Sequence, residues 1–335
     1  MLEMVRTFCR RNRGEKRRRN QVRFRSRCYS LEALEPRVVL SADLAWAFDV
    51  ELPAATVAEE HIHEAELHVL SSDLFGNPLY SEPRVSLAAG DGGAAAAAGD
   101  DKLWQGYDLD QTFSLHSRPG ANHVIYLDFD GHVTSGTYWN DSFNSGEDIV
   151  TTAWSSDADD TSFSDMEKAL IQRVWARVSE DYAPFDINVT TQEPAVADLI
   201  KTDSADTKWG MRVVIGPNTW FQPAGGVAYV GSFNWNTDTP CFVFNTTESG
   251  ITESSSHEVG HTLGLSHDGD LSTAYHSGNG TGETSWGPIM GAPYGRNLTQ
   301  WSKGEYQEAN NSQDDLAIIS TQNGFSYRPD DHGNI

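Results

Sequence analysis

The chain contains very little cysteine, with three residues among 335. Cys9 and Cys28 lie within the first 37 residues, which leaves Cys241 alone in the remainder. A disulfide framework therefore cannot hold the main part of the chain together. A chain of this length can bury a large core without such links, so export is not excluded. Cys241 lies in the apolar run PCFVF at 240–244, where we expect it to be a small buried hydrophobic residue.

Long apolar stretches are also missing. No segment approaches the roughly 20 apolar residues of a transmembrane helix, so we expect no membrane span. Basic residues are scarce after residue 37. Residues 1–37 hold twelve Lys or Arg against four Asp or Glu, whereas the other 298 residues carry a net charge of −32. Such an acidic body repels nucleic acid and anionic membranes, and we expect neither as a partner.

The densest group of reactive side chains is the run HEVGHTLGLSH at 257–267. On a helix, His257 and His261 lie one turn apart on the same face and can reach one metal ion. Gly264 tolerates the positive φ with which a helix can end and reverse, so that His267 returns as a third ligand. Three imidazoles leave a fourth position for water, as in a catalytic zinc site, where the pKa of the water is about 7. Glu258 is then the expected general base.

This HExxHxxGxxH motif, followed by SWGPIMG at 285–291, resembles the zinc helix and Met-turn of the metzincin metalloproteases. The resemblance implies one catalytic Zn²⁺, with Met290 in a tight turn beneath the three histidines. Asp268, directly after the third histidine, resembles the reprolysin or adamalysin pattern, and we expect it to make hydrogen bonds near the metal. The scarcity of cysteine departs from reprolysins, so the subfamily stays open.

The resemblance also implies an α/β (α+β) fold with a mixed, twisted five-stranded sheet, the zinc-bearing helix, the Met-turn and a C-terminal helix. We expect the catalytic domain at 104–335. Apolar runs there predict strands at 123–129, 185–191, 211–215, 226–231 and 242–245. Met166, Leu170, Val174 and Val178 recur at helical spacing and predict a helix from 165 to 181.

Polar residues mark the starts of two further helices. Thr252 and the serines at 254–256 indicate the start of the zinc helix. Ser302 with Glu305, and Ser312 with Asp315, resemble capping boxes for a C-terminal helix that ends near residue 320.

Residues that contact a substrate are expected on two segments. Gly226, Val227 and Ala228 lie in the strand that we predict to be the antiparallel edge strand, against which metzincins bind an extended peptide. The alternative is an ordinary sheet strand without substrate contact. Tyr294 follows Met290 by four positions, and we favour a pocket wall over a metal ligand. The pocket formed by 288–301 would set the side-chain preference.

The N-terminal third is expected to carry export and latency. The run LEPRVVLSA at 34–42 is similar to the LEPR-xLL segment of many large bacterial surface and exported proteins. We therefore expect a basic leader at 1–45 and a pro-segment or spacer at 46–103. Residues 88–101 are nearly all Ala, Gly and Asp, which predicts a flexible linker and a place for cleavage of a zymogen. The surroundings of Cys28 lack the matrixin cysteine-switch pattern, so we do not expect a thiol on the zinc.

A second metal is a weaker expectation. Asp157, Asp159, Asp160 and Asp165 offer hard oxygen ligands suited to Ca²⁺. Their spacing lacks the glycine and terminal glutamate of an EF-hand, and a solvated loop is the favoured interpretation.

The sequence as a whole predicts a secreted or cell-surface, monomeric zinc metalloendopeptidase that acts on protein or peptide substrates. The first alternative is a cell-surface binding module that keeps the zinc site without turnover. The second is metal-dependent hydrolysis of a bond other than a peptide bond.

Overall fold

The computed structural model describes residues 71–84, 106–157, 159 and 161–329. The expected leader, the linker at 88–101 and Asp160 lie outside the described residues.

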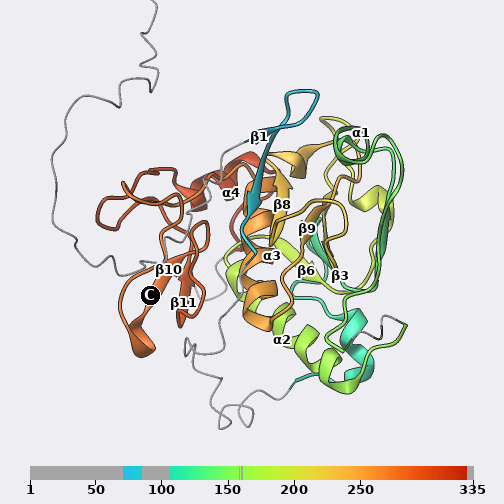
Figure 1. Ribbon diagram of the computed structural model, residues 1–335, viewed down its shortest axis with the longest axis horizontal. Coiled ribbons are helices and arrows are strands. Elements are labelled where there is room, and N and C mark those ends of the chain that lie inside the picture. The colour runs from blue at the N-terminus through green and yellow to red at the C-terminus, as the bar shows by residue number, and fades with distance from the viewer. Residues whose placement is uncertain (1–70, 85–105, 158, 160, 330–335) are drawn as a thin grey trace, which may run out of the picture. The chain divides into compact units, whose positions relative to one another are not determined.

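A seven-stranded mixed sheet forms the centre of the fold (Figure 1). Its strands are β1 (Ser71–Ser72), β2 (Pro78–Glu82), β3 (His123–Asp128), β6 (Ile187–Thr190), β7 (Gly210–Ile215), β8 (Gly226–Tyr229) and β9 (Cys241–Val243), in the order β1-β2-β8-β9-β7-β3-β6. Neighbours among β9, β7, β3 and β6 are parallel, and β8 is antiparallel to β9. The expected mixed α/β fold is confirmed, and the five strands overlap their predicted positions.

Two strands were not expected. β1 and β2 come from the predicted pro-segment, and β2 pairs antiparallel with β8, with Leu79 opposite Tyr229 and Glu82 opposite Gly226. The sheet therefore has seven strands instead of five. The prediction that β8 is an edge strand is wrong for this chain, because β2 and β9 pair with β8 on its two sides.

Smaller elements complete the described part of the chain. They are β4 (His132–Thr134) paired with β5 (Ile149–Thr151), β10 (Trp286–Pro288) paired with β11 (Leu298–Gln300), helix α1 (Tyr138–Phe143), and the short helices η2 (Leu109–Ser114), η3 (Val196–Asp198), η4 (Ser232–Asn234) and η5 (Gly282–Thr284). Among the described helices, none has the length and apolar character needed to cross a membrane.

Helix α2 (Asp165–Asp181) lies where the sequence predicts it. Ser164 and Glu167 form a reciprocal capping box that satisfies the first backbone amides. The buried face matches the predicted one in part, since Val174 and Val178 belong to both. Ile171, Val174 and Val178 are fully buried, whereas Met166 is 79% exposed. Met166 belongs to the first turn, beyond the part of the helix that the core covers.

Helix α3 (Glu248–Thr262) carries the zinc motif and begins earlier than predicted. Thr247 caps it by accepting a hydrogen bond from the Gly250 amide, so the expected start at Thr252 and the serines is wrong. Those serines are interior and buried. Ser256 donates to Asp181 Oδ2 at 2.6 Å, which joins α3 to the end of α2.

Helix α4 (Asp315–Gln322) ends close to the predicted position. Its cap is Asp314, whose side chain accepts from the Ala317 amide, instead of Ser312. The expected helix start at Ser302 and Glu305 is wrong, because Ser302 follows β11 and its amide donates to Asp315 Oδ2 at 2.9 Å.

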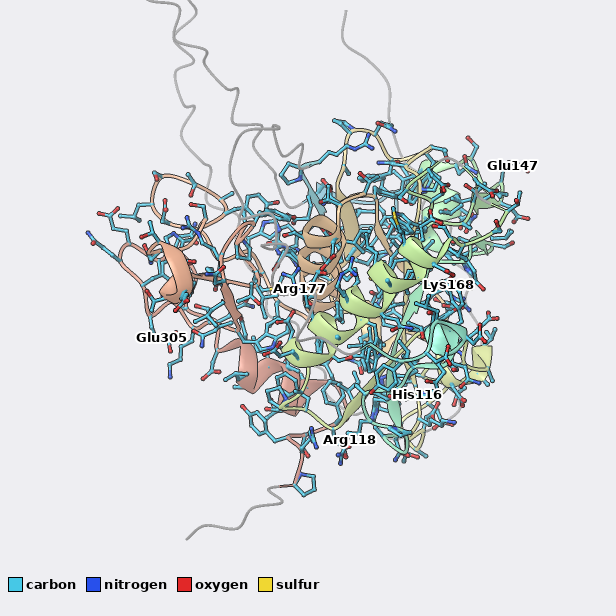
Figure 2. The ribbon with its side chains drawn as sticks, turned by 90° about the horizontal axis from the view of Figure 1, so that it is seen from below. His116, Arg118, Glu147, Lys168, Arg177 and Glu305 are labelled. Carbon is cyan, nitrogen blue, oxygen red and sulfur yellow. The ribbon has the colours of Figure 1, made fainter. Side chains whose placement is uncertain are left out.

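The core lies on both faces of the sheet. Val213 of β7 packs with α2 and α3 on one face, and its neighbour Val214 packs with Trp139 of α1 on the other. Cys241 is buried in the first cluster, as expected. Burial of each aliphatic side chain in these two clusters stabilises the fold by about 1.5–3 kcal/mol. Arg177 (labelled in Figure 2) adds an ion pair between α2 and α3, with Nη2 2.7 Å from Glu253 Oε1.

Candidate metal centre

The three predicted histidines meet at one point. His257 and His261 project from the same face of α3, and their Nε2 atoms lie 3.0 Å apart. His267 Nε2 lies 3.0 Å from His261 Nε2. Tetrahedral nitrogen ligands at about 2.0–2.1 Å from zinc would be separated by roughly 3.3 Å, close to these distances.

The backbone orients two of the rings for metal binding. His257 Nδ1 lies 2.8 Å from the Ile289 carbonyl oxygen, and His261 Nδ1 lies 2.9 Å from the Leu265 carbonyl oxygen. A carbonyl can only accept, so each Nδ1 carries the proton and each Nε2 keeps its lone pair for a metal. The donor set therefore fits zinc.

The chain reverses directly after α3. Gly264 has a φ of +101°, which glycine adopts without a Cβ clash. The Gly264 amide donates to the His261 carbonyl and the Leu265 amide to the Gly260 carbonyl, so the turn is closed by hydrogen bonds. The turn returns His267 to the other two histidines, as predicted.

Met290 lies against the zinc helix. It is fully buried, and a Cβ placed on Gly260 would collide with its sulfur and lie 3.2 Å from its Cε. The Asp268 amide donates to the Met290 carbonyl at 2.7 Å. The predicted turn is thus joined both to the helix and to the residue after His267.

Asp268 is fully buried but is not among the metal-facing donors. Its Oδ1 accepts from Asn311 Nδ2 at 3.2 Å, and burial raises its pKa to about 7. The Asp268 side chain therefore makes a hydrogen bond of the kind that the sequence predicts for it.

Glu258 is fully buried beneath β8. Neither of its carboxylate oxygens has a hydrogen-bond partner within the part of the chain that the structure describes. Burial and the nearby Glu82 raise the pKa of Glu258 well above its ordinary value. Its close neighbour is Gly226, where a Cβ would lie 2.8 Å from Glu258 Cδ.

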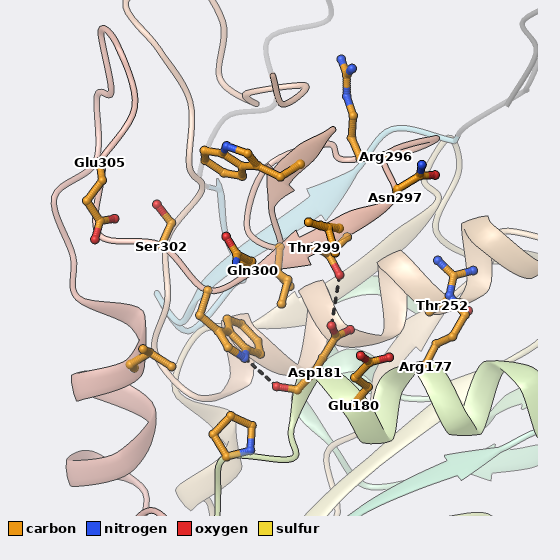
Figure 3. Close-up of a pocket in the computed structure, with 16 residues that line it drawn as sticks. Arg177, Glu180, Asp181, Thr252, Arg296, Asn297, Thr299, Gln300, Ser302 and Glu305 are labelled. Atoms are coloured by element: carbon orange, nitrogen blue, oxygen red, sulfur yellow. Dashed lines mark hydrogen bonds between the residues drawn. The ribbon is translucent and has the colours of Figure 1, made fainter. Parts of the chain in front are cut away.

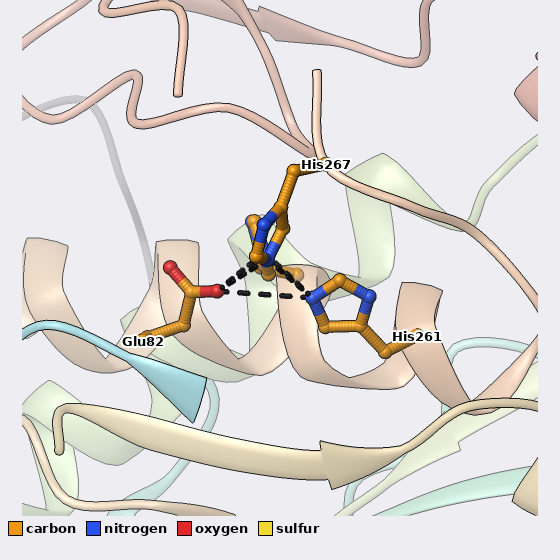
Figure 4. A group of neighbouring side chains, drawn as sticks. Glu82, His261 and His267 are labelled. Carbon is orange, nitrogen blue, oxygen red and sulfur yellow. Dashed lines mark hydrogen bonds and ion pairs between the residues drawn. The ribbon is translucent and has the colours of Figure 1, made fainter. Parts of the chain in front are cut away.

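The sequence did not predict the fourth donor of this group. Glu82, at the end of β2, places Oε1 2.9 Å from His257 Nε2, 2.9 Å from His267 Nε2 and 3.7 Å from His261 Nε2 (Figure 4). Glu82 is only 3% exposed. Among the described residues, these four are the group of acidic and histidine side chains that could hold a metal ion.

Burial and the charges of the neighbouring side chains together set the pKa values in this group. Burial disfavours the charged forms, yet the histidines hold the pKa of Glu82 well below its ordinary value. Glu82 in turn raises the pKa of His257 against the opposing effect of burial. Burial lowers the pKa of His261 to about 3, so this imidazole is neutral, as a metal ligand must be.

Two tyrosines enclose the group. The Tyr80 ring centroid lies 4.4 Å from that of His261 and 4.1 Å from that of His267. The Tyr275 hydroxyl donates to Glu82 Oε1 at 3.2 Å, and its ring lies 4.3 Å from that of His267. Neither tyrosine was predicted. The turn-forming sequence GNP at 76–78 could have indicated a hairpin, but no local pattern indicates its partner strand.

The residues expected to contact substrate lie near the group. Gly226, Val227 and Ala228 are buried in β8, between β2 and β9. The Tyr294 hydroxyl lies 3.2 Å from the Ser254 hydroxyl of α3 and makes a hydrogen bond with it. Burial raises the Tyr294 pKa above its ordinary value.

A cavity of about 600 Å³ lies beside α3 (Figure 3). Its lining includes Thr252 of α3, Ile289 and residues 296–302, which overlap the pocket segment predicted at 288–301, but Tyr294 is not among the lining residues. Asp181 lies in its wall and accepts from the Thr299 hydroxyl at 3.1 Å. Its main-chain carbonyl accepts from Trp301 Nε1 at 2.8 Å.

The expected calcium site gains no support. Asp157 Oδ1 accepts from the Asp159 amide, and Asp159 Oδ1 accepts from the Thr161 amide and hydroxyl. These two carboxylates therefore serve local turns. They do not join a metal-binding group among the described residues.

Comparison with known proteins gives one family. Residues 218–302 match the family Reprolysin_5, described as metallo-peptidase family M12. The matched stretch contains β8, α3, the three histidines and Met290. No curated protein matches the chain significantly. The match supports a metalloprotease and agrees with the expected activity at this level.

Proposed function

We propose that this protein is an exported, monomeric zinc endopeptidase that hydrolyses peptide bonds with a water molecule activated by Glu258. The observation that carries the proposal is the convergence of three imidazole Nε2 atoms, two of them from helix α3, which also carries the buried Glu258. The family match over 218–302 supports the same activity.

Each residue of the centre has a distinct role in this proposal. His257, His261 and His267 hold the metal, and the carbonyls of Ile289 and Leu265 fix the orientation of the first two rings. Zinc held by these residues would supply polarisation of the scissile carbonyl and a lower pKa of the attacking water.

Glu258 takes the proton from the water and later delivers it to the leaving amine, so no covalent intermediate forms. An extended substrate pairs with β8, the strand that β2 covers in this structure. This pairing leads the peptide past Gly226, directly next to Glu258. The cavity between α3 and residues 296–302 is the proposed pocket for a substrate side chain.

The test is hydrolysis of an unfolded protein by the full chain at matched zinc content. Because Glu82 contacts two of the ligand nitrogens, the parent and Glu82→Ala are assayed together, each with and without Glu258→Gln. We expect Glu258→Gln to abolish hydrolysis in both backgrounds while one zinc stays bound.

Three results would contradict the proposal. Retained hydrolysis after Glu258→Gln, with zinc present, would remove the assigned general base. If neither the parent nor Glu82→Ala cleaves protein although both bind zinc, the non-catalytic binding module becomes the better interpretation. Cleavage of esters but not of peptides would favour the other hydrolase class.

A further inference from the structure

β2 occupies the surface at which the proposed substrate would bind. It pairs with β8 along four residues, from Leu79 opposite Tyr229 to Glu82 opposite Gly226. A peptide that binds by strand addition needs these same backbone groups of β8. An extended substrate therefore has to displace β2 before it can pair with this strand.

Glu82 extends this obstruction to the metal. A catalytic zinc has three protein ligands and an open fourth position, whereas a site with four protein ligands is closed to water. Glu82 Oε1 lies 2.9 Å from both His257 Nε2 and His267 Nε2. These separations are close to the roughly 3.3 Å expected between ligands of one tetrahedral zinc. Its carboxylate oxygen therefore has the place of a fourth ligand.

Other contacts hold Glu82 in this position. Tyr80 precedes it by two residues on the same face of β2 and packs on His261 and His267. Tyr275 donates from its hydroxyl to Glu82 Oε1. β2 thus contacts the metal centre through its side chains and pairs with β8 through its backbone.

The segment that follows β2 in the sequence offers a place where cleavage would allow β2 to leave β8. Residues 88–101, after β2 and before the next described segment, consist almost entirely of Ala, Gly and Asp. Small residues of this kind favour proteolytic cleavage. A cut there would turn an intramolecular contact into a bimolecular one and remove the millimolar effective concentration that a short tether provides.

We propose that Glu82 is the fourth protein ligand of the zinc and that β2 keeps the chain latent by filling the peptide-binding side of β8. The inference rests on the proposed function, because latency has meaning only for an active centre. It assigns the inhibitory ligand to a carboxylate.

The decisive experiment uses the full chain with Co²⁺ in place of zinc, because visible absorption of Co²⁺ reports its ligands. Acetohydroxamate, a small metal-binding probe, is added to the parent, Glu82→Ala and Glu82→Gln. Ser81→Ala is the matched control, since it alters the same strand and leaves the carboxylate intact. We expect the parent and Ser81→Ala spectra to stay unchanged, and the two Glu82 variants to differ from them and to respond to the probe.

The inference is overturned if the parent and Glu82→Ala have the same spectrum, or respond alike to the probe. Glu82→Gln keeps the size of the side chain and serves the same comparison if Glu82→Ala does not fold. Hydrolysis of an unfolded protein by the zinc forms should rise at least about tenfold in Glu82→Ala. If no variant hydrolyses protein, the proposed function fails, and the cobalt spectra still decide whether Glu82 is a ligand.

Discussion

Gly226→Ala places one methyl group between β8 and Glu258. An ideal Cβ at residue 226 would lie 2.8 Å from Glu258 Cδ and 2.9 Å from its Cγ, and it would overlap Oε1. Ordinary van der Waals contact begins at 3.4 Å, so the carboxylate has to retreat. The three atoms nearest to this methyl group all belong to Glu258 and none to a histidine, so zinc binding should persist.

The size of the effect follows from this displacement. Moving a reacting group by about 1 Å can reduce the rate by about 100-fold. The equivalent rise in the activation free energy is about 2.7 kcal/mol. The loss should not exceed that of Glu258→Gln, because a general base contributes at most about 10⁴-fold.

The assay is kcat/KM on an unfolded protein substrate, with zinc content measured in the same samples. It is made in the Glu82→Ala background, so that Glu82 does not compete with the substrate. Val214→Ala is the control, because Val214 lies in β7, outside the proposed substrate strand, and packs in the cluster with Phe242. That variant should lose about 2 kcal/mol of stability and keep kcat/KM.

The reasoning fails if Gly226→Ala keeps kcat/KM within twofold of its parent at equal zinc content. It also fails if Val214→Ala loses as much activity as Gly226→Ala. The second result would mean that damage to the sheet, and not displacement of Glu258, lowers the rate.

Three further predictions concern latency, acid stability and helix capping. Tyr275→Phe removes the donor to Glu82 and should raise the response of the Co²⁺ form to acetohydroxamate, whereas an unchanged spectrum would deny Tyr275 this role. Burial lowers the pKa of His123 to about 4, from an ordinary value of 6.5. As the pH falls from 6.5 to 4, the unfolded chain therefore binds the proton before the folded chain does, and the free energy of unfolding decreases. His123→Phe should make this decrease smaller by up to about 3 kcal/mol in denaturant titrations. The same dependence of the free energy of unfolding on pH in both proteins would refute the prediction. Ser164→Ala removes the cap of α2 and should lower the free energy of unfolding by about 1 kcal/mol, which the same titrations at pH 7 test.

Local sequence patterns predicted the elements that depend on near neighbours. Helix α2 lies where apolar residues recur at helical spacing, because that spacing depends on residues three or four positions apart. The three histidines converge for the same reason. His257 and His261 share a helical face, and the positive φ of Gly264 directs the chain to His267 within a few residues.

The start of α3 was missed because its stabilising contacts are not local. Its first three turns are mostly polar, and the helix lacks the apolar periodicity from which a helix is predicted. Ser254 accepts from Asn245, and Ser256 donates to Asp181 of α2. The polar side chains of this buried helix form hydrogen bonds with residues from other elements. In the sequence alone, its serines therefore resemble a helix cap.

The sequence by itself indicated that His257, His261 and His267 converge, because their spacing along a helix and its turn is local, and the resemblance to the metzincins implied the mixed α/β fold. Only the tertiary structure placed Glu82 at the same centre. Its contact with His257 and His267 depends on the pairing of β2 with β8, strands far apart along the chain. Backbone hydrogen bonds of that kind are available to any extended segment, so no local pattern specifies which strand takes the place beside β8.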